Sequence, residues 1–112
     1  MKYSESLKKN RDFRLVYKEG KSCANKYLVM YIRENHSDVN RLGISVSKKV
    51  GNSVVRSRSK RLIYESYRLN VKDIKTGYDF VFVARSAINE KKYSDVEAAM
   101  INLFKKAGIY LK

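Results

Sequence analysis

The residue types that could break a bond are few and scattered in this sequence. A protein that hydrolyses a phosphodiester by itself needs clustered carboxylates for metal ions or histidines for proton transfer. The 11 acidic residues make no spaced metal motif, and the one histidine, His36, lies in the polar turn H-S-D-V-N. The one cysteine, Cys23, has no cysteine or histidine neighbour, and G-N-S-V-V-R lacks the P-loop pattern. The sequence therefore predicts a binding protein with no catalytic or metal-ligating residue of its own.

Basic residues, by contrast, are concentrated between residues 48 and 68, in a stretch that predicts a helix beginning after Gly51 with Asn52 as its N-cap. At about 100° per residue, one set shares an arc of roughly 140°: Arg56, Ser57, Lys60, Arg61 and Arg68. An apolar set lies on the opposite side, with Arg58 beside it: Val55, Leu62, Ile63 and Leu69, together with Ser59 and Ser66.

The predicted helix has one face for a core and one face for phosphate groups. A merely solvated charged surface is the alternative, but Glu65 is the one acid between residues 48 and 68, so the basic face is not neutralised by i,i+4 partners. Lys48 and Lys49 also precede the helix start, where free amides and the helix dipole attract anions. Nucleic-acid binding is the favoured interpretation.

The overall charge supports the same interpretation. A net charge of +14 arises from 25 lysines and arginines against 11 acids, and a small domain with this charge repels itself unless a polyanion shares its surface. Nucleic acid or an anionic membrane could fill that role. No apolar run approaches about 18 residues, and the N-terminus lacks the apolar stretch of a signal peptide. With one cysteine and no disulfide, we expect a cytoplasmic protein without a membrane.

The rest of the chain predicts an α+β fold that positions these residues. At 112 residues and 44% hydrophobic content, one domain over residues 1–112 is expected, with residues 1–9 as a mobile basic segment. The patterns first predict a helix over 11–19, capped by Asn10 and ended by a left-handed Gly20, and then a short strand over 21–24. A hairpin of strands 27–33 and 41–47 follows, and then the basic helix and a central strand over 78–85. The last predicted element is a helix that opens with a Ser94–Glu97 capping box and ends at Gly108. The order α-β-β-β-α-β-α describes a single-domain, two-layer α/β sandwich.

One face of the predicted hairpin could form a groove. Alternation places Tyr31 beside Gly43, Ser45 and Ser47, so that small residues leave room next to an aromatic wall. Unpaired bases stack on such rings, although a solvated sheet face explains the pattern equally well. Phe13 and Tyr17 stand four residues apart on one helix face, and the pattern leaves core packing and groove lining as equal alternatives for them.

Three segments resemble the protein subunit of bacterial ribonuclease P: L-K-K-N-R-D-F-R-L-V-Y-K-E-G-K-S at 7–22, R-L-G-I-S-V-S-K-K-V-G-N-S-V at 41–54 and R-S-R-S-K-R-L-I-Y-E at 56–65. The last two are specific together, because the family combines this strand, the K-K turn and an arginine-rich helix in one run. Ser57 and Tyr64 depart from the family pattern, which usually has asparagine and arginine there. Both changes remove a donor or a charge from the basic face.

The resemblance implies that a large RNA, with bound magnesium ions, cleaves the 5′ leader from precursor tRNA, while the small protein binds that RNA and the leader. It implies Mg²⁺ held mainly by RNA, with no protein motif for it and no obligate protein partner. It also implies a left-handed crossover from strand 41–47 through the basic helix to strand 78–85. General packing rules predict a right-handed connection between parallel strands.

The resemblance also assigns site residues. Together with their basic neighbours, the arginine-rich helix residues are expected to contact the catalytic RNA: Lys48, Lys49, Arg56, Arg58, Lys60, Arg61 and Arg68. The leader groove is expected to comprise Phe13, Tyr17, Tyr31, Ser45, Ser47 and Lys49, which favours a functional role for the two helix aromatics. A structural RNA-binding protein of the ribosomal type, with no substrate role, is the alternative. An autonomous metal-dependent nuclease is a third hypothesis.

Overall fold

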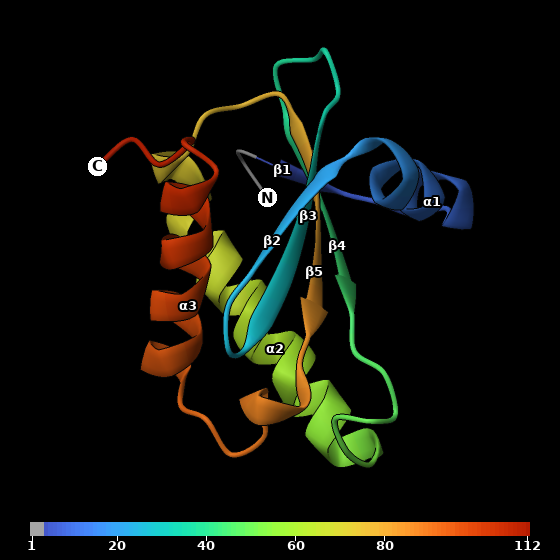
Figure 1. Cartoon of the computed structure of the whole chain (residues 1–112), viewed down its shortest axis with the longest axis vertical. Coiled ribbons are helices and arrows are strands. Elements are labelled where there is room, and N and C mark those ends of the chain that lie inside the picture. Colours follow the sequence, from blue (N-terminus) through green and yellow to red (C-terminus); the bar gives the residue numbers. More distant parts are fainter. Residues whose placement is uncertain (1–3) are drawn as a thin grey trace.

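Residues 4–112, which the computed structural model describes, form a mixed sheet with helices on both of its faces (Figure 1). The elements follow one another as β1 (Ser4–Ser6), α1 (Asn10–Glu19), β2 (Lys21–Ala24), β3 (Leu28–Glu34), β4 (Asn40–Ser45), α2 (Ser53–Asn70), β5 (Tyr78–Ala84) and α3 (Tyr93–Lys106). Short 3₁₀ turns at Val71–Asp73 and Ser86–Ile88 flank β5. The predicted α+β class and the order of its seven elements are confirmed, with β1 as an addition.

The strand order is β1-β4-β5-β3-β2, so β5 lies at the centre of the sheet. It pairs parallel with β4 and antiparallel with β3, and Val81 lies opposite both Gly43 and Tyr31. The continuous apolar run of β5 predicted this central place. The predicted hairpin of β3 and β4 is wrong, because β5 inserts between the two strands that the polar turn connects.

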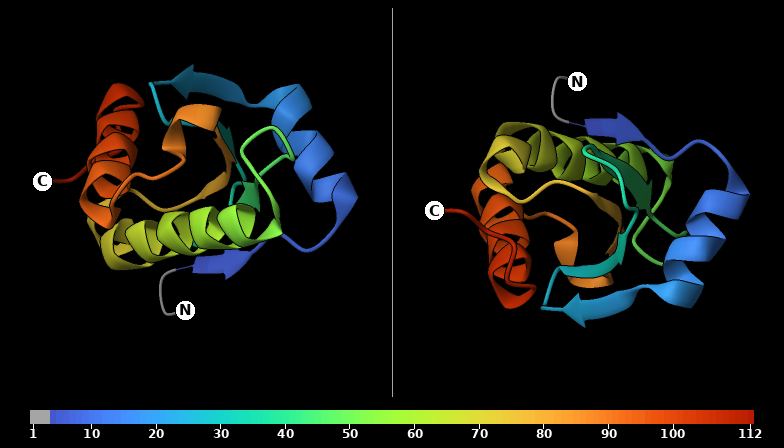
Figure 2. Two further views of the ribbon diagram at one scale, coloured as in Figure 1. Left: turned by 90° about the horizontal axis from the view of Figure 1, so that it is seen from below. Right: turned by 90° about the horizontal axis from the view of Figure 1, so that it is seen from above.

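The connection from β4 through α2 to β5 is left-handed, as the family resemblance implied. In Figure 1 both strands run downward with β5 to the left of β4, and Figure 2 shows α2 on the far side of the sheet. Right-handed crossovers are strongly preferred in general. The handedness places α2 and α3 on one face of the sheet and leaves the other face to α1.

The main core lies between the sheet and the pair α2 and α3. Period-two alternation directs one side of each strand into it, and a period near 3.6 directs one stripe of each helix. Its centre is a group of aromatic rings whose neighbouring centroids lie 5.8–6.2 Å apart: Tyr67, Phe80, Phe82 and Phe104. Each such side chain stabilises the fold by about 1.5–3 kcal/mol on burial. This core makes the sheet a rigid support for whatever lies on its opposite face.

The ends of the helices agree with the sequence in part. The Asn52 side chain accepts a hydrogen bond of 3.0 Å from the Val55 amide, as predicted, and Gly108 follows α3 with a left-handed φ of 74°. Gly20 is not left-handed but extended, with φ −81°. A glycine is needed there because a Cβ would lie 2.5 Å from the Val16 carbonyl oxygen. The predicted Asn10 cap is also wrong, since α1 already includes Asn10 and its N-cap has no side-chain bond.

The start of α3 differs from its predicted capping box. The helix begins at Tyr93, and the Asp95 side chain accepts a 3.1 Å bond from the Lys92 amide. Glu97 instead accepts from the Tyr93 hydroxyl and the Asn70 side-chain amide, each at 2.8 Å. The carboxylate expected to cap α3 therefore ties it to α2.

The N-terminal segment is more ordered than predicted. Ser4–Ser6 pairs parallel with β4, and the buried Ser4 hydroxyl lies 2.7 Å from the Tyr67 hydroxyl. Leu7 is buried against α1. The predicted mobile segment is therefore wrong for residues 4–7, because backbone pairing compensates for a strand sequence without apolar alternation. Residues 1–3 lie outside the described part of the chain.

Candidate nucleic-acid interface

The sheet face away from α2 and α3 is only partly covered. Strand register arranges its residues in three rows across β4, β5 and β3: Arg41–Asp79–Arg33, Gly43–Val81–Tyr31 and Ser45–Val83–Val29. Helix α1 lies over the first two rows, with Val16 buried in a small second core beside Val81 and Leu7. The third row stays half-buried. An open surface therefore borders α1 on the side of Ser45.

Phe13 and Tyr17 form the wall of this open surface. A Cβ on Gly43 would lie 2.6 Å from the Phe13 ring, so the glycine lets the ring lie directly on the sheet. The Tyr17 ring meets the edge of Tyr31 at 4.8 Å and 89° and keeps 40% exposure. Burial raises the pKa of the Tyr17 hydroxyl, an effect that the neighbouring Ser45 side chain partly opposes. Phe13 is thus mainly a packing residue, whereas Tyr17 presents a ring to solvent.

The structure brings together four of the six residues predicted for the groove: Phe13, Tyr17, Tyr31 and Ser45. Val29 and Val83 complete its floor, and we call these six residues the aromatic trough. Neither valine was predicted as a groove residue; the apolar run of β5 suggested cover on both faces of Val83, and Val29 lies on β3 on the same side as Tyr31. Alternation was the available signal, since Val83 shares its side of the strand with Val81, opposite Tyr31.

Ser47 and Lys49, the other two predicted groove residues, lie beyond the end of β4. Both are exposed in the turn that leads to α2. The Val50 amide donates to the Ser47 carbonyl at 3.1 Å, and the Ser86 hydroxyl donates to the Lys49 carbonyl at 3.3 Å. They extend the surface from the trough towards α2.

The basic face of α2 presents side chains of unequal availability. Lys60 and Arg61 are exposed, as are Lys48 and Lys49, and within residues 4–112 none of the four forms an ion pair. Arg56 is half-buried, and its Nε is buried without a hydrogen-bond partner in the described part of the chain. These five side chains form the available part of the predicted phosphate-binding face.

Arg68 and Arg58 differ from that group. Arg68 donates two hydrogen bonds, of 3.0 and 2.8 Å, to the Glu65 carboxylate, which raises the pKa of Arg68 and lowers that of Glu65. The expectation that the basic face carries no neutralising partner is therefore wrong at this position. The Arg58 guanidinium donates to the Lys91 carbonyl at 2.7 Å and ties α2 to the segment before α3.

The buried stripe of α2 also differs from the prediction at one position. Ile63, Ser59 and Ser66 are buried as expected, but Leu69 is 45% exposed. Two other residues are buried instead: Tyr67 packs in the main core, and the Asn70 side-chain amide donates to the Glu97 carboxylate. The buried stripe of α2 is therefore displaced from Leu69 to Tyr67 and Asn70 at the C-terminal end of the helix.

One chain segment connects the aromatic trough to the basic face. Gly43 lies under Phe13, Ser45 borders Tyr17, Lys49 follows in the turn and α2 begins at Ser53. Figures 1 and 2 show α1 and the N-terminal end of α2 on the same side of the molecule, with this segment running between them. An extended strand of nucleotides could follow this path from stacking rings to cations.

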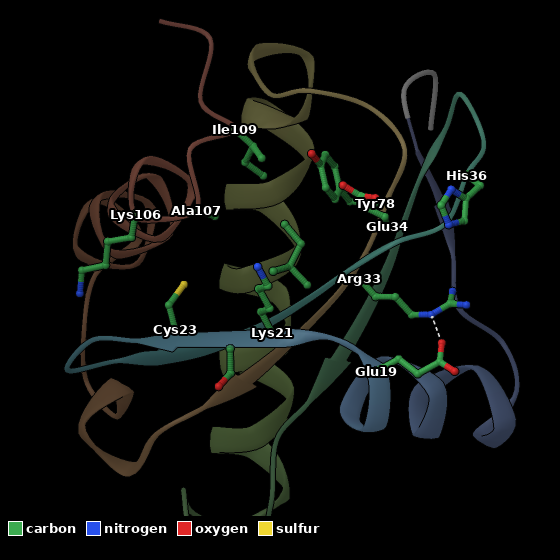
Figure 3. A pocket seen from close by; sticks show the side chains of 12 residues that line it. Glu19, Lys21, Cys23, Arg33, Glu34, His36, Tyr78, Lys106, Ala107 and Ile109 are labelled. Carbon is green, nitrogen blue, oxygen red and sulfur yellow. Dashed lines mark hydrogen bonds and ion pairs between the residues drawn. The ribbon is translucent and has the colours of Figure 1, made fainter.

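A cavity of about 710 Å³ lies elsewhere, between β2 and the C-terminal end of α3. Cys23 and Lys21 rise from β2 towards Ala107 and Ile109 (Figure 3). Burial raises the pKa of the Cys23 thiol, and the charge of Lys106 opposes this effect to a smaller extent. The raised pKa disfavours the nucleophilic thiolate form of Cys23. None of the site residues predicted from the sequence lines this cavity.

The described residues also bear on metals and membranes. Among residues 4–112, no group of three or more histidine, cysteine, aspartate or glutamate side chains is placed to hold a metal ion. No helix in the same range has the length and apolar character needed to span a bilayer.

Comparison with known proteins adds independent information. A family model described as "Ribonuclease P" matches residues 1–108. The ribonuclease P protein component of Clostridium botulinum (strain 657 / Type Ba4) is 62% identical over 105 residues, which cover 93% of this chain and 95% of that protein. The corresponding protein of Clostridium novyi is 56% identical over 112 residues, covering 98% and 99%.

Solved structures show the same fold. The ribonuclease P protein of Staphylococcus aureus matches with a TM-score of 0.85 and 36% identity, covering 94% of this chain and 96% of that one. The protein from Thermotoga maritima matches with a TM-score of 0.84 and 37% identity, covering 91% and 96%. The sequence match over nearly the whole length and the shared fold show that this chain belongs to the ribonuclease P protein family.

Proposed function

We propose that this protein is the RNA-binding subunit of ribonuclease P, in which it binds the catalytic RNA and the 5′ leader of precursor tRNA. The basic face of α2 binds the RNA subunit, and the aromatic trough holds the leader. The observation that carries the proposal is the half-exposed Tyr17–Tyr31 pair on the strand face that leads directly into the basic helix.

The aromatic trough suits a single strand of nucleotides. Unpaired bases stack on aromatic rings with about 1–3 kcal/mol each and little dependence on sequence. The small Ser45 and the two valines leave space beside Tyr17, and Lys48 and Lys49 lie where the phosphates of a strand leaving the trough would pass. Tight, sequence-tolerant leader binding is the expected result.

Cleavage belongs to the RNA subunit and the Mg²⁺ that it binds. The protein adds binding energy on the leader, which precursor tRNA carries and the mature product lacks, so the enzyme prefers precursor. Its net charge of +14 also screens RNA phosphates and lowers the Mg²⁺ concentration that the RNA needs. We place this reaction in the cytoplasm, with the RNA subunit and precursor tRNA as the partners.

Reconstitution with the cognate RNA tests the proposal. The protein is expected to stimulate precursor tRNA cleavage at low Mg²⁺, and no stimulation would contradict its role in the enzyme. RNA-free protein with Mg²⁺ is expected to be inactive, whereas sustained cleavage would support an autonomous nuclease. Co-purification with ribosomes and no effect on tRNA processing would favour the structural alternative.

A further inference from the structure

We propose that Asp79 is a positioning residue for the aromatic trough, because it holds the two arginines that pair with opposite ends of α1. The inference rests on the proposed function, since it concerns how the leader-binding side chains are held in place. Asp79 is not a member of the trough: it lies on β5, in the row next to that of Gly43, Val81 and Tyr31, and is 1% exposed.

Asp79 is fully paired despite its burial. Arg41 donates to its two carboxylate oxygens at 2.7 Å each, Asn35 donates at 2.9 Å, and the Arg33 guanidinium lies 3.4 Å away. Burying a carboxylate is costly unless charged groups and hydrogen bonds compensate it. The two arginines are therefore fixed from below by one buried charge.

The same arginines reach α1. The Arg33 Nε donates to Glu19 at 2.9 Å, the pair drawn as a dashed line in Figure 3. The Arg41 guanidinium lies 4.0 Å from the Asp12 carboxylate. An ionic chain thus runs from the first turn of α1, through the sheet, to its last turn: Asp12, Arg41, Asp79, Arg33 and Glu19.

The distance between the two acids on α1 is close to the distance between the two arginines on the sheet. Asp12 and Glu19 are seven residues apart, which is about two turns and about 10.5 Å along a helix. Arg41 and Arg33 flank Asp79 on neighbouring strands, so their backbones lie about two strand spacings, or about 9.6 Å, apart. Helix α1 runs across the strand direction (Figure 1), and each end therefore meets one arginine.

This arrangement fixes the rotation of α1 about its own axis. Asp12, Val16 and Glu19 share one face of α1, while Phe13 and Tyr17 lie about 100° further round, where the Phe13 ring also packs on the sheet over Gly43. The contacts of Val16 and Phe13 with the small core are apolar and non-directional, whereas charge-assisted hydrogen bonds are directional. The ionic chain consequently sets where the Tyr17 ring stands against Tyr31.

The ionic chain is not itself an RNA site. Three carboxylates and two guanidinium groups leave it with one net negative charge, and its centre is buried. Its effect on binding should therefore depend on the leader. A merely structural role would change the binding of all RNA substrates alike.

Two surface variants of the reconstituted enzyme test this dependence. Glu19→Gln and Asp12→Asn each break one outer link, and Asp73→Asn is the matched control. The control removes one carboxylate and its 3.4 Å pair with Lys112, away from α1. The measurement is the ratio of affinities for precursor and mature tRNA. Each test variant should lower this ratio roughly two- to fivefold, the range of an exposed ion pair, and the control should leave it unchanged.

Asp79→Asn removes the centre of the chain and should lower the ratio by about tenfold, provided that circular dichroism shows a folded protein. Tyr17→Ala should itself lower the ratio of precursor to mature tRNA affinity. If it does so while Glu19→Gln and Asp12→Asn leave that ratio unchanged, the positioning role is overturned and the proposed function stays intact. Equal losses on precursor and mature tRNA would also overturn it. A native enzyme without precursor preference would instead refute the proposed function, and this inference with it.

Discussion

Phe13 and Tyr17 stand one helical turn apart on α1 but make different contacts. Phe13 occupies the space that the missing side chain of Gly43 leaves on the sheet. Tyr17 makes a T-shaped contact with Tyr31, neighbours Ser45 and remains 40% exposed. The helical spacing left core and groove as equal alternatives for both residues, because a spacing of four does not distinguish a buried ring from one at the rim, and the family resemblance favoured the groove for both. The structure separates them.

Tyr17→Ala should weaken binding of precursor tRNA to the reconstituted enzyme by about 1–3 kcal/mol, the value of one lost stack. Affinity for mature tRNA should barely change, because the mature molecule carries no leader. Tyr17→Phe keeps the ring and should bind precursor like the native protein. Fluorescence titration with both tRNAs measures the difference, and an equal loss on both would argue against a leader groove.

Asp79 should couple stability to pH. Burial alone would raise the pKa of its carboxyl, but hydrogen bonds from Arg41 and Asn35 and the charges of Arg41 and Arg33 lower it below its ordinary value. A carboxyl with a lowered folded pKa contributes stability above its unfolded pKa of about 4. That contribution is lost as the pH falls through the folded value.

The unfolding free energy of the native protein should therefore decline more steeply below about pH 4 than that of Asp79→Asn. Urea unfolding at fixed ionic strength, from neutral pH downward, provides the two curves. Parallel curves would show that the Asp79 carboxyl does not titrate differently in the folded and unfolded states.

At the scale of elements, local patterns predicted the helices and strands but not their pairing. The central place of β5 followed from its apolar run, and the Asn52 cap from its residue type. The insertion of β5 between β3 and β4 depends on pairs that are 38 to 56 residues apart in the chain, from Arg41–Asp79 to Leu28–Ala84, and periodicity does not encode such pairs. Strand β1 was missed because S-E-S has no apolar alternation, and its pairing rests on backbone hydrogen bonds.

The candidate site shows the same division. Residue types and the family motif predicted the trough aromatics and the basic face of α2. The neutralisation of Arg68 by Glu65 was visible in their i,i+3 spacing, whereas the bond from Arg58 to the Lys91 carbonyl joins segments 33 residues apart. Long-range contacts of this kind decide which cations are free for RNA.

Arg61 and Arg68 form a matched pair for that distinction. Arg61→Ala should lower the slope of log affinity for the RNA subunit against log salt by about one unit, because one phosphate contact is lost. Arg68→Ala should change the slope less, because Glu65 already neutralises this guanidinium. Filter binding across a salt series gives both slopes. Equal slopes in Arg61→Ala and the native protein would exclude a phosphate contact at Arg61.

At the scale of the whole molecule, α1 and α2 lie on opposite faces of the sheet, yet the aromatic trough and the start of the basic helix, the two surfaces proposed to bind RNA, lie on the same side of the molecule. The main core fixes α2 and α3 on one face, and the left-handed crossover brings the start of α2 to the side where α1 forms the trough wall. The 25 lysines and arginines of the chain outnumber its 11 acidic residues. This arrangement suits the proposed role, in which the protein holds two RNA segments next to each other.

Site-directed cross-linking in the reconstituted enzyme shows whether the aromatic trough holds the leader while the basic face of α2 holds the RNA subunit. Three single-cysteine variants are made in a Cys23→Ser background: Ser47→Cys at the end of the trough, Ser57→Cys on the basic face and Ala98→Cys on the outside of α3. All three positions are exposed, and a photo-reactive group is attached to the new cysteine of each variant. With precursor tRNA bound, the account predicts cross-links from position 47 to leader nucleotides, from position 57 to the RNA subunit, and from position 98 to neither. Leader cross-links that are absent at position 47, or equally strong at position 98, would contradict it.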